Sequence, residues 1–281
     1  MSAVTTSRHA AGVTPRSAAP LKVTQARVLR SEWTKFRSLR STMWTLLIAL
    51  TLMIGLGALF SAVNASQYHT MGPAGRATFS PVAVSLTGTF FAVVAFGVLG
   101  VLLMSGEYGT GMIRSSLTVV PRRLPVLWGK LAVFAGAVFS LSLVASFVSF
   151  YLGQAILNGH HLGVSITSPD ALRSVIGAAL YITVAGLIGL ALGGLLRATA
   201  AGISVFAAVF FVLPPLASLL PTSIAEHLTR YLPSYAGSAI WGGSQGVAGG
   251  ALSAWTGFGL LCGYAAVLTA AAAWRLRHSD A

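Results

Sequence analysis

Residues 105–130, which read SGEYGTGMIRSSLTVVPRRLPVLWGK, form a long polar interruption between two strongly apolar segments. The stretch contains Glu107, one of only five acidic residues in the chain. It also contains four basic residues, Arg114, Arg122, Arg123 and Lys130. Apolar segments of about 20 residues are long enough to cross a bilayer as helices. The pattern therefore predicts a charged loop held at one face of a membrane.

The composition of the whole chain indicates the same environment. Of the 281 residues, 55% are hydrophobic and only 8% are charged. About 25% of the residues of a soluble domain are charged, so this chain has too little charge to cover a globule in water. The alternating pattern of a β-barrel is absent, which leaves helices as the spanning elements. We therefore predict an all-α integral membrane protein.

Six apolar segments meet the length expected of a spanning helix. They cover residues 43–63, 82–104, 131–154, 172–196, 199–220 and 254–274. Two of them carry closely spaced glycines, Gly189 with Gly193 and Gly259 with Gly263, which are typical of close helix contacts in membranes. Pro214 and Pro215 are expected to break or end the fifth segment.

The basic residues predict how the chain is oriented. Fifteen of the 18 lysines and arginines lie in residues 1–42, in residues 105–130, at position 197 and after the last segment. Only three lie in the connections on the other side. The positive-inside rule then places both termini and the 105–130 loop of this multi-pass membrane protein in the cytoplasm. Topology thus accounts for the net charge of +13, and no nucleic-acid partner is expected.

The first 42 residues divide into two parts. Residues 1–20 are rich in Ser, Thr, Ala and Pro and predict a disordered cytoplasmic tail. Residues 21–42 place Leu29, Trp33, Phe36 and Met43 on one helical face, with basic residues around it. This pattern favours an amphipathic helix in the headgroup plane. A plain charged lead-in to the first span is the alternative.

The longest outer segment, residues 221–253, has helical character. Residues 223–232 place Glu226 and Arg230 four positions apart, and residues 234–241 are apolar enough to dip into the outer leaflet. A glycine-rich turn region follows at 242–250. We expect a short outer helix pair here, with an exposed loop as the alternative.

Several kinds of chemistry are missing from the sequence. No complete phosphate-binding loop, HExxH zinc motif or GxSxG nucleophile motif occurs. The adjacent His160 and His161 are interpreted as a solvated outer turn, so neither a metal site nor a catalytic site is expected. The middles of the spans carry no Asp, Glu, Lys or Arg, which ion-coupled transporters usually need. A transporter of this kind would take its energy through a cytoplasmic contact.

Two sequence blocks resemble a known family. One is RSEWTKFRSLR at 30–40, before the first span. The other is GEYGTGMIR at 106–114, followed by Pro121-Arg-Arg and by Gly129-Lys130. With six spans and a long outer segment between the last two, they resemble the membrane subunits of ATP-binding-cassette (ABC) transporters, specifically type-two exporter-like permeases of the actinobacterial kind. The resemblance covers about residues 22–280 and implies one six-helix permease domain over 21–281, located in a bacterial cell membrane.

The resemblance also implies roles for residues. A cytoplasmic coupling helix near 107–117 would dock on a separate ABC ATPase, which alone would use ATP, and the permease would need no cofactor. Its ATPase-coupling residues would be Gly106, Glu107, Tyr108, Gly109, Gly111, Met112, Ile113 and Arg114. The interfacial helix would contribute Arg30, Glu32, Trp33, Lys35, Phe36 and Arg37 beside membrane lipid. A solvated turn with topogenic charges is the alternative for the coupling segment.

The implied function is that of a transport subunit. Two permease subunits, identical or different, would pair across their first and fifth spans. They would couple ATP hydrolysis by the ATPase to movement, expected as export, of an unidentified hydrophobic or amphipathic substrate. The alternative is an integral membrane binding or immunity protein that captures a lipid-like ligand without turnover.

Overall fold

The computed structural model describes residues 25–38, 40–109, 123–242 and 250–278, and every regular element among them is a helix. Six helices are long and apolar enough to cross a membrane. Five of them are continuous α-helices: α2 (Arg40–Gln67), α5 (Thr89–Gly109), α7 (Arg123–Asn158), α8 (Ala171–Leu196) and α13 (Ala254–His278). The remaining one, Thr199–Ser218, is the fifth span in chain order, and it combines α9 (Thr199–Ala207), η2 (Ala208–Val212) and α10 (Leu213–Ser218). The predicted all-α, six-span architecture is confirmed.

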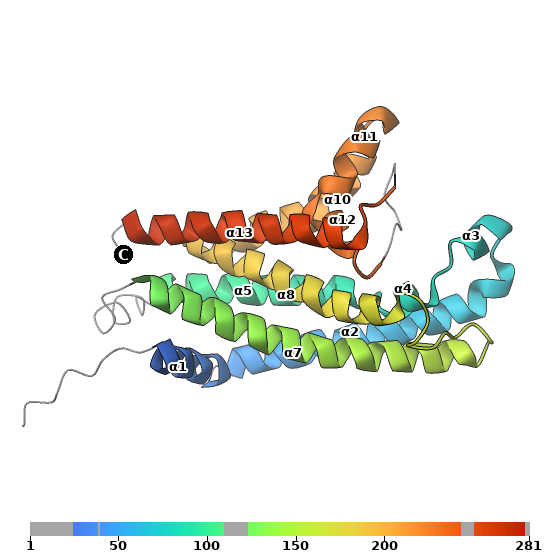
Figure 1. Ribbon diagram of the computed structural model, residues 1–281, viewed down its shortest axis with the longest axis horizontal. Helices are drawn as coiled ribbons and strands as arrows, with labels where there is room; N and C mark the ends of the chain where they lie inside the picture. Colours follow the sequence, from blue (N-terminus) through green and yellow to red (C-terminus); the bar gives the residue numbers. More distant parts are fainter. Residues whose placement is uncertain (1–24, 39, 110–122, 243–249, 279–281) are drawn as a thin grey trace, which may run out of the picture.

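Most of these helices lie side by side along the long axis of the molecule (Figure 1). Because successive spans run in opposite directions, the start of α7 and the end of α13 share one end of the bundle, on the left of Figure 1. Helix α1 (Gln25–Ser38) lies at that same end, against α7. The first and last described residues therefore lie on one side, as the charge pattern predicts.

Helix α8 forms the centre of the bundle. In the most apolar part of α8, 83% of the residues are buried. The corresponding shares in α2 and α13 are 28% and 22%. Glycines bring α8 close to α5, because a Cβ atom on Gly189 would stand 2.2 Å from the Gly97 carbonyl oxygen. A Cβ on Gly193 would stand 2.6 Å from the Val101 carbonyl oxygen. Small residues thus allow the two backbones to touch, as is common in membrane helix pairs.

The second span begins later than predicted. Residues Pro81–Ser85 form a separate short helix, α4, and α5 begins only at Thr89. The chain turns at Gly88, which lies so close to α2 that a Cβ there would overlap the Met53 carbonyl group. The Ser85 carbonyl accepts a hydrogen bond of 2.7 Å from Ser149 of α7. The contacts of residues 85 and 88 with α7 and α2 therefore interrupt the apolar segment that is predicted as one helix.

Both ends of the 105–130 stretch are helical. Helix α5 continues to Gly109, and α7 begins at Arg123 rather than at the predicted 131. Pro125 does not prevent this, because proline is tolerated in the first turn of a helix. Three charged residues of this stretch, Glu107, Arg123 and Lys130, therefore belong to spanning helices.

The fifth span is interrupted next to its two prolines, as predicted. Helix α9 gives way to the π-helical turn η2, and Pro214 and Pro215 then occupy the first turn of α10. A proline lacks the amide hydrogen that an α-helix needs, and a local π turn is a common accommodation. The chain resumes as a helix and ends at Ser218, so the prolines interrupt the span without ending it.

The outer connections are largely helical too. Short helices α3 (Pro73–Ala77) and α11 (Thr222–Leu228) extend away from the bundle (Figure 1). The turns η1 (Tyr68–Thr70) and η3 (Thr229–Tyr231) follow α2 and α11, and α12 (Pro233–Ser238) packs against α13. Two short helices, α11 and α12, are therefore present where a helix pair is predicted, and their outer location stays a prediction. The predicted tail 1–20 and most of the glycine-rich turn lie outside the described residues.

The two glycine pairs in the spans differ in their surroundings. Gly189 and Gly193 pack against α5, but Cβ atoms on Gly259 and Gly263 would meet nothing within 4 Å in the described chain. We expect Gly189→Ala to lower the free energy of unfolding by about 1–3 kcal/mol, because the methyl group would overpack a backbone contact. Thermal unfolding in detergent measures this change.

The matched control is Gly263→Ala in α13. Its methyl group has free space, and alanine favours a helix over glycine by about 1 kcal/mol. We expect its melting temperature to stay level or rise. Equal destabilisation by the two substitutions would contradict the assignment of α8 as the packed centre.

Candidate functional site

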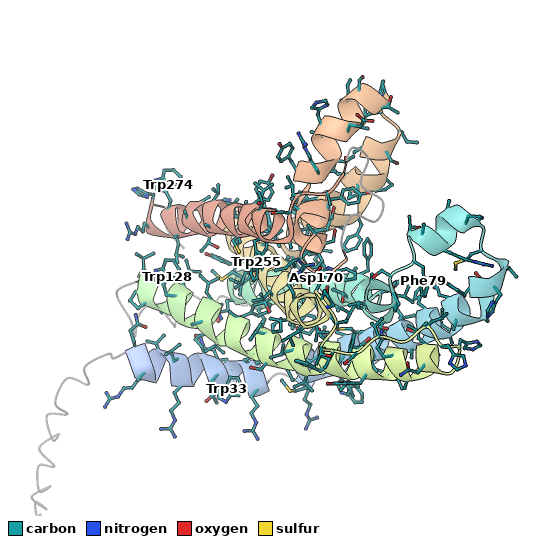
Figure 2. The ribbon with its side chains drawn as sticks, turned by 45° about the vertical axis from the view of Figure 1, so that its right-hand side comes forward. Trp33, Phe79, Trp128, Asp170, Trp255 and Trp274 are labelled. Carbon is teal, nitrogen blue, oxygen red and sulfur yellow. The ribbon has the colours of Figure 1, made fainter. Side chains whose placement is uncertain are left out.

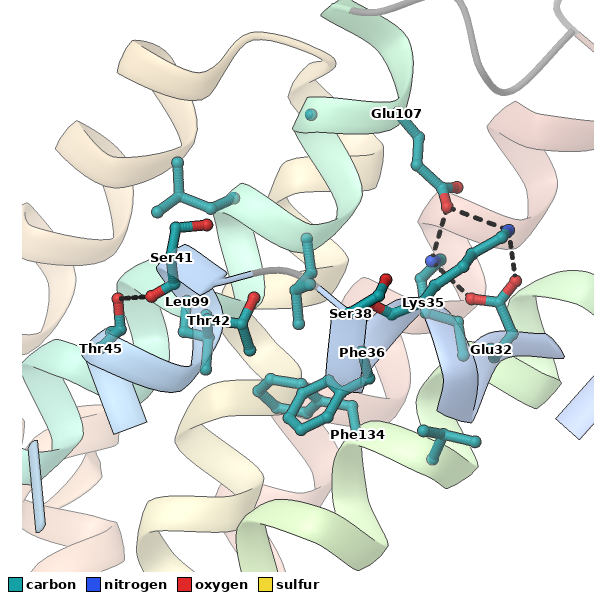
Figure 3. A pocket seen from close by; sticks show the side chains of 15 residues that line it. Glu32, Lys35, Phe36, Ser38, Ser41, Thr42, Thr45, Leu99, Glu107 and Phe134 are labelled. Carbon is teal, nitrogen blue, oxygen red and sulfur yellow. Dashed lines mark hydrogen bonds and ion pairs between the residues drawn. The ribbon is translucent and has the colours of Figure 1, made fainter. Parts of the chain in front are cut away.

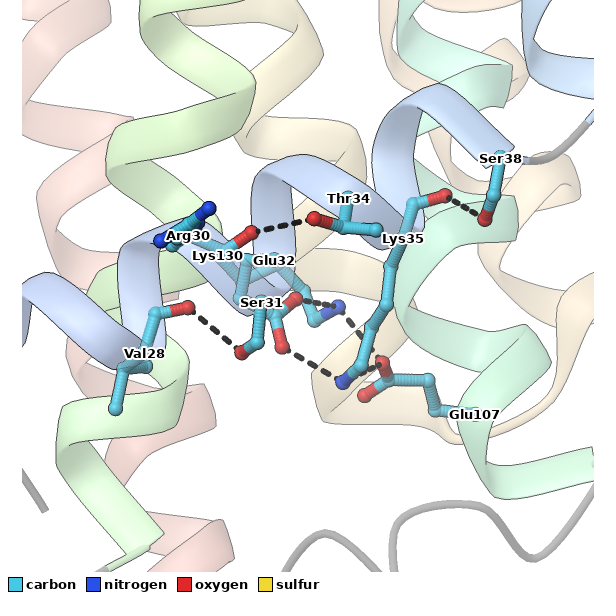
Figure 4. A network of polar contacts seen from close by, with 9 residues as sticks. All are labelled: Val28, Arg30, Ser31, Glu32, Thr34, Lys35, Ser38, Glu107 and Lys130. Carbon is cyan, nitrogen blue, oxygen red and sulfur yellow. Dashed lines mark hydrogen bonds and ion pairs between the residues drawn. The ribbon is translucent and has the colours of Figure 1, made fainter.

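Four charged side chains from three helices meet at the end of the bundle that carries α1 (Figure 4). Lys130 Nζ of α7 donates hydrogen bonds to Glu32 Oε2 of α1 at 2.7 Å and to Glu107 Oε1 of α5 at 2.8 Å. Lys35 Nζ of α1 lies 2.7 Å from Glu32 Oε1 and 3.5 Å from Glu107 Oε1. Each ammonium group therefore bridges both carboxylates. We call these four residues the charge cluster.

The charge cluster is buried although it lies near an end of the molecule. Glu32, Glu107 and Lys130 are 4%, 8% and 8% exposed. Isolated charges at such positions would lose several kcal/mol of hydration, so they persist only when they are paired. Two carboxylates and two ammonium groups sum to zero charge. The pairing thus binds α1 to α5 and α7 by a contact that is costly to open.

Local sequence explains how α1 reaches this position. Glu32 and Lys35 are three residues apart and so lie on one side of the helix. Val28 and Phe36 lie on that side too and are buried. Gly129 of α7 faces Val28 so closely that a Cβ there would stand 2.8 Å from a Val28 methyl group. The missing side chain at Gly129 therefore lets α1 lie directly against α7.

The pairing shifts the titration of the two α1 residues. Burial opposes the ionisation of Glu32, but the charge and hydrogen bond of Lys130, with help from Lys35, outweigh it and hold the pKa of Glu32 below its ordinary 4.5. Burial likewise opposes the charge on Lys35. Its hydrogen bond to Glu32 and the charge of Glu107 outweigh that effect and raise the pKa of Lys35 above 10.5. Glu32 and Lys35 are therefore both ionised around neutral pH.

Further polar contacts tie the neighbouring helices together at the same end. The guanidinium carbon of Arg197 lies 4.9 Å from the centre of the Tyr108 ring, a cation–π contact between the α8 terminus and α5. Ser105 and Thr199 join α5 to α9 by a hydrogen bond of 2.8 Å. Arg275 of α13 donates a hydrogen bond to the Leu195 carbonyl at the end of α8. The end of α5 is thus a junction that contacts α1, α7, α8 and α9.

A cavity of about 440 Å³ adjoins the charge cluster (Figure 3). Its walls come from α1, α2, α5 and α7. Apolar side chains form most of the surface, and hydroxyl groups from the end of α1 and the start of α2 complete it. We call it the cluster cavity.

The structure locates the predicted coupling residues only in part. Gly106, Glu107, Tyr108 and Gly109 form the last turn of α5. Gly111, Met112, Ile113 and Arg114 lie outside the described residues, so the predicted coupling helix stays a prediction beyond Gly109. Glu107 faces the interior of this chain, where Lys130 and Lys35 engage it. The Glu107 carboxylate is thus buried and already paired within this chain, and its predicted contact with an ATPase stays a prediction.

The helix predicted before the first span exists as α1, and its interfacial position stays a prediction, but its predicted faces need correction. Arg30, Glu32, Trp33, Lys35, Phe36 and Arg37 all lie on α1. Trp33 is 48% exposed, whereas Phe36 is buried in the bundle, so the two do not share a lipid-facing side. Lys35 belongs to the charge cluster and not to the outer basic surface, where Arg30 and Arg37 remain exposed. The amphipathic pattern is defined by the apolar and basic residues alone, so it does not predict that Glu32 is buried.

Three further residues of the site, Val28, Gly129 and Lys130, are not predicted from the sequence. There Lys130 is one of the basic residues of the 105–130 stretch and, with Gly129, part of the family resemblance. One signal could have found it: Glu32 and Glu107 are two of only five acidic residues, and each lies near a membrane boundary where unpaired acids are unusual. Such residues call for a cationic partner, and Lys130 is a nearby candidate at the start of the third span.

A comparison with protein families identifies the chain. A sequence model described as ABC-2 family transporter protein matches residues 28–215, about two thirds of the chain. The chain belongs to the ABC-2 transporter family. The match begins inside α1 and ends in α10, so it includes all four residues of the charge cluster. A comparison with curated proteins gives no match.

Family membership settles the general class. The chain is an ABC-2 type permease, a multi-pass membrane protein and the membrane subunit of an ABC transporter. The family resemblance drawn from residues 30–40 and 106–114 is confirmed, while the actinobacterial kind stays a prediction. Within the described residues no group of three or more His, Cys, Asp or Glu side chains forms a metal site.

Removing the shared cation tests whether the charge cluster holds α1 in place. We expect Lys130→Met to lower the free energy of unfolding by about 3–5 kcal/mol, because two buried carboxylates would then share Lys35 alone. Thermal unfolding of the purified permease in detergent measures the loss. Arg37→Met, which removes an exposed cation from α1, is the control and should change stability by no more than about 0.5 kcal/mol.

The pKa shifts of Glu32 and Lys35 predict the pH at which the contact between α1 and α7 opens. Because the pKa of Glu32 is lowered, its contribution to stability is complete above pH 4.5 and is lost as the pH falls further. Because the pKa of Lys35 is raised, its contribution is lost only above pH 10.5. Spin labels on exposed Thr34 of α1 and Gly136 of α7 should report one distance between about pH 5 and 10, and a broader distribution below about pH 4. A transition near neutral pH would contradict this assignment.

Proposed function

We propose that this ABC-2 permease pairs with a second permease subunit and a cytoplasmic ABC ATPase, and exports a hydrophobic or amphipathic substrate. The observation that carries the proposal is the charge cluster. Glu107 and Lys130 belong to the two helices that flank residues 110–122, the segment expected to meet the ATPase. Glu32 and Lys35 belong to α1. A displacement of the segment 110–122 would therefore be transmitted to α1 and to the spans together.

The distribution of aromatic residues supports a membrane boundary at this end. Trp33, Trp128 and Trp274 are 48%, 55% and 65% exposed and lie toward the end of the bundle that carries α1 (Figure 2). Exposed tryptophans are enriched at membrane–water interfaces. Trp255 and Trp274 lie 19 residues apart on α13, or about 28 Å at 1.5 Å per residue. That distance is close to the thickness of a bilayer core, about 30 Å.

Charge supports the cytoplasmic assignment of the same end. The arginines and histidine of the last turn of α13 lie there, together with the basic residues of α1. A surplus of Lys and Arg marks cytoplasmic connections. On this proposal the charge cluster sits where an ATPase can act on it, and the short helices α3 and α11 lie outside.

Co-purification with the ATPase tests the proposal. The permease, co-expressed with its cytoplasmic ABC ATPase, should form a complex whose ATP hydrolysis exceeds that of the ATPase alone. In Glu107→Gln we expect the complex to persist while the stimulation falls at least tenfold, because the uncharged side chain cannot hold Lys130 and Lys35 as Glu107 does. Steady-state phosphate release in nanodiscs measures the stimulation.

Glu226→Gln is the matched control, because Glu226 is an exposed carboxylate on α11. It should leave both the complex and the stimulation unchanged. Stimulation that survives Glu107→Gln would contradict a coupling role for the charge cluster. A permease that never associates with an ATPase yet binds a ligand would instead support a membrane binding protein without turnover.

A further inference from the structure

We propose that the cluster cavity is a binding site for an uncharged amphiphile whose polar head carries hydroxyl groups, of the monoacylglycerol class. The inference goes beyond the transport function proposed above, because it concerns the permease alone and needs no ATPase. It follows from the volume, the lining and the charge of the cavity, and from its opening toward the outside of the bundle.

The size and walls of the cavity suit an apolar chain. Its volume of about 440 Å³ falls within the range of about 300–1,000 Å³ that is usual for small-molecule sites. The apolar lining is formed by Phe36, Leu99, Leu102, Leu103, Val133 and Phe134. These residues come from three helices, so the chain of a ligand would be enclosed from several sides.

The polar part of the lining calls for hydrogen-bond donors. Ser38, Ser41, Thr42 and Thr45 bring four hydroxyl groups to the cavity. Ser38 and Thr45 donate their protons to the backbone carbonyls of Lys35 and Ser41. A hydroxyl oxygen that has donated its proton can still accept hydrogen bonds. The hydroxyl groups of a ligand head would supply these bonds.

The charge cluster selects against charged ligands. Lys35 and Lys130, the two ammonium groups at the cavity, both bridge Glu32 and Glu107. An anionic head would have to compete with these carboxylates, and a cationic head would have to compete with the two lysines. Burying a charge without a partner of its own costs several kcal/mol. An uncharged head avoids that cost.

The cavity is accessible from outside the bundle. Leu102 lines it and is 42% exposed, and Ser41 is exposed as well. The neighbouring face of α2 is also exposed at Trp44, Leu47 and Ile48, which suits contact with lipid. An amphiphile dissolved in the bilayer would therefore reach the cavity sideways, with its head toward the charge cluster at the membrane boundary.

A glycine pair provides the test. Gly106 lines the cavity, and among the described residues a Cβ there would meet no atom within 4 Å. Gly106→Leu should therefore obstruct the cavity without disturbing the helix. Gly136→Leu is the matched control, because Gly136 lies on α7 away from the cavity and is equally unobstructed. Val133→Phe, which adds volume from another wall, is a second obstructing variant.

The measurement is equilibrium binding of tritiated monomyristin to the permease in nanodiscs, corrected for uptake by empty nanodiscs. We expect saturable binding to wild type and Gly136→Leu, and a Kd at least tenfold higher in folded Gly106→Leu or Val133→Phe. A myristoyl lysophosphatidic acid and a tetradecyl ammonium should compete at least tenfold less well than unlabelled monomyristin.

Three results would overturn the proposal: no saturable binding to wild type, unchanged affinity in a folded obstructed variant, or equal competition by a charged analogue. The thermal unfolding profile shows which variants are folded, and Val133→Phe decides the outcome if Gly106→Leu does not fold. Because no ATPase is present, failure here leaves the coupling function untouched. Failure of that function appears instead as a missing complex or missing stimulation.

Discussion

The buried ion pairs between α1 and the two helices that flank residues 110–122 constrain this end of the molecule. A carboxylate or an ammonium group is stable there only while its partners stay within reach, because each would otherwise lose its hydration without compensation. Glu32, Glu107, Lys35 and Lys130 therefore have to move together or exchange partners together. The sequence-distant helices α1, α5 and α7 are thereby joined at one point, a useful property for a transporter whose energy comes from outside its membrane domain.

The rest of the bundle divides into a packed centre and a looser periphery. Backbone contacts through Gly97, Gly189 and Gly193 hold α5 against α8, and the density of these contacts leaves little room for sliding. In the most apolar parts of the first and fifth spans only 28% of the residues are buried. The fifth span also contains a π-helical turn beside its prolines. Such turns are frequent at functional positions. Because α5 belongs to the packed centre and also carries Glu107, a force applied at the charge cluster would reach the centre directly.

Hydropathy predicted the spanning helices well. The sequence pattern predicted poorly which side of a helix is buried. Length and apolar content suffice to identify a spanning helix, and all six were found. The direction in which a helix faces depends on its neighbours. On α1 the buried side contains Glu32, which an amphipathic pattern assigns to water. Likewise the glycines of α8 pack against α5, while Gly259 and Gly263 of α13 have the same spacing and no contact in the described chain.

By itself the sequence determined the membrane environment, the number of spans, the shared side of the described ends and the transporter family. These depend on composition and local pattern, which each segment carries independently of the others. Only the tertiary structure decided that the stretch around residues 105–130 contributes a buried anion and a buried cation to one cluster with α1. It also decided that α5 begins at Thr89 and that a cavity adjoins the charge cluster. These features depend on distances between segments up to about 100 residues apart, which only packing brings together.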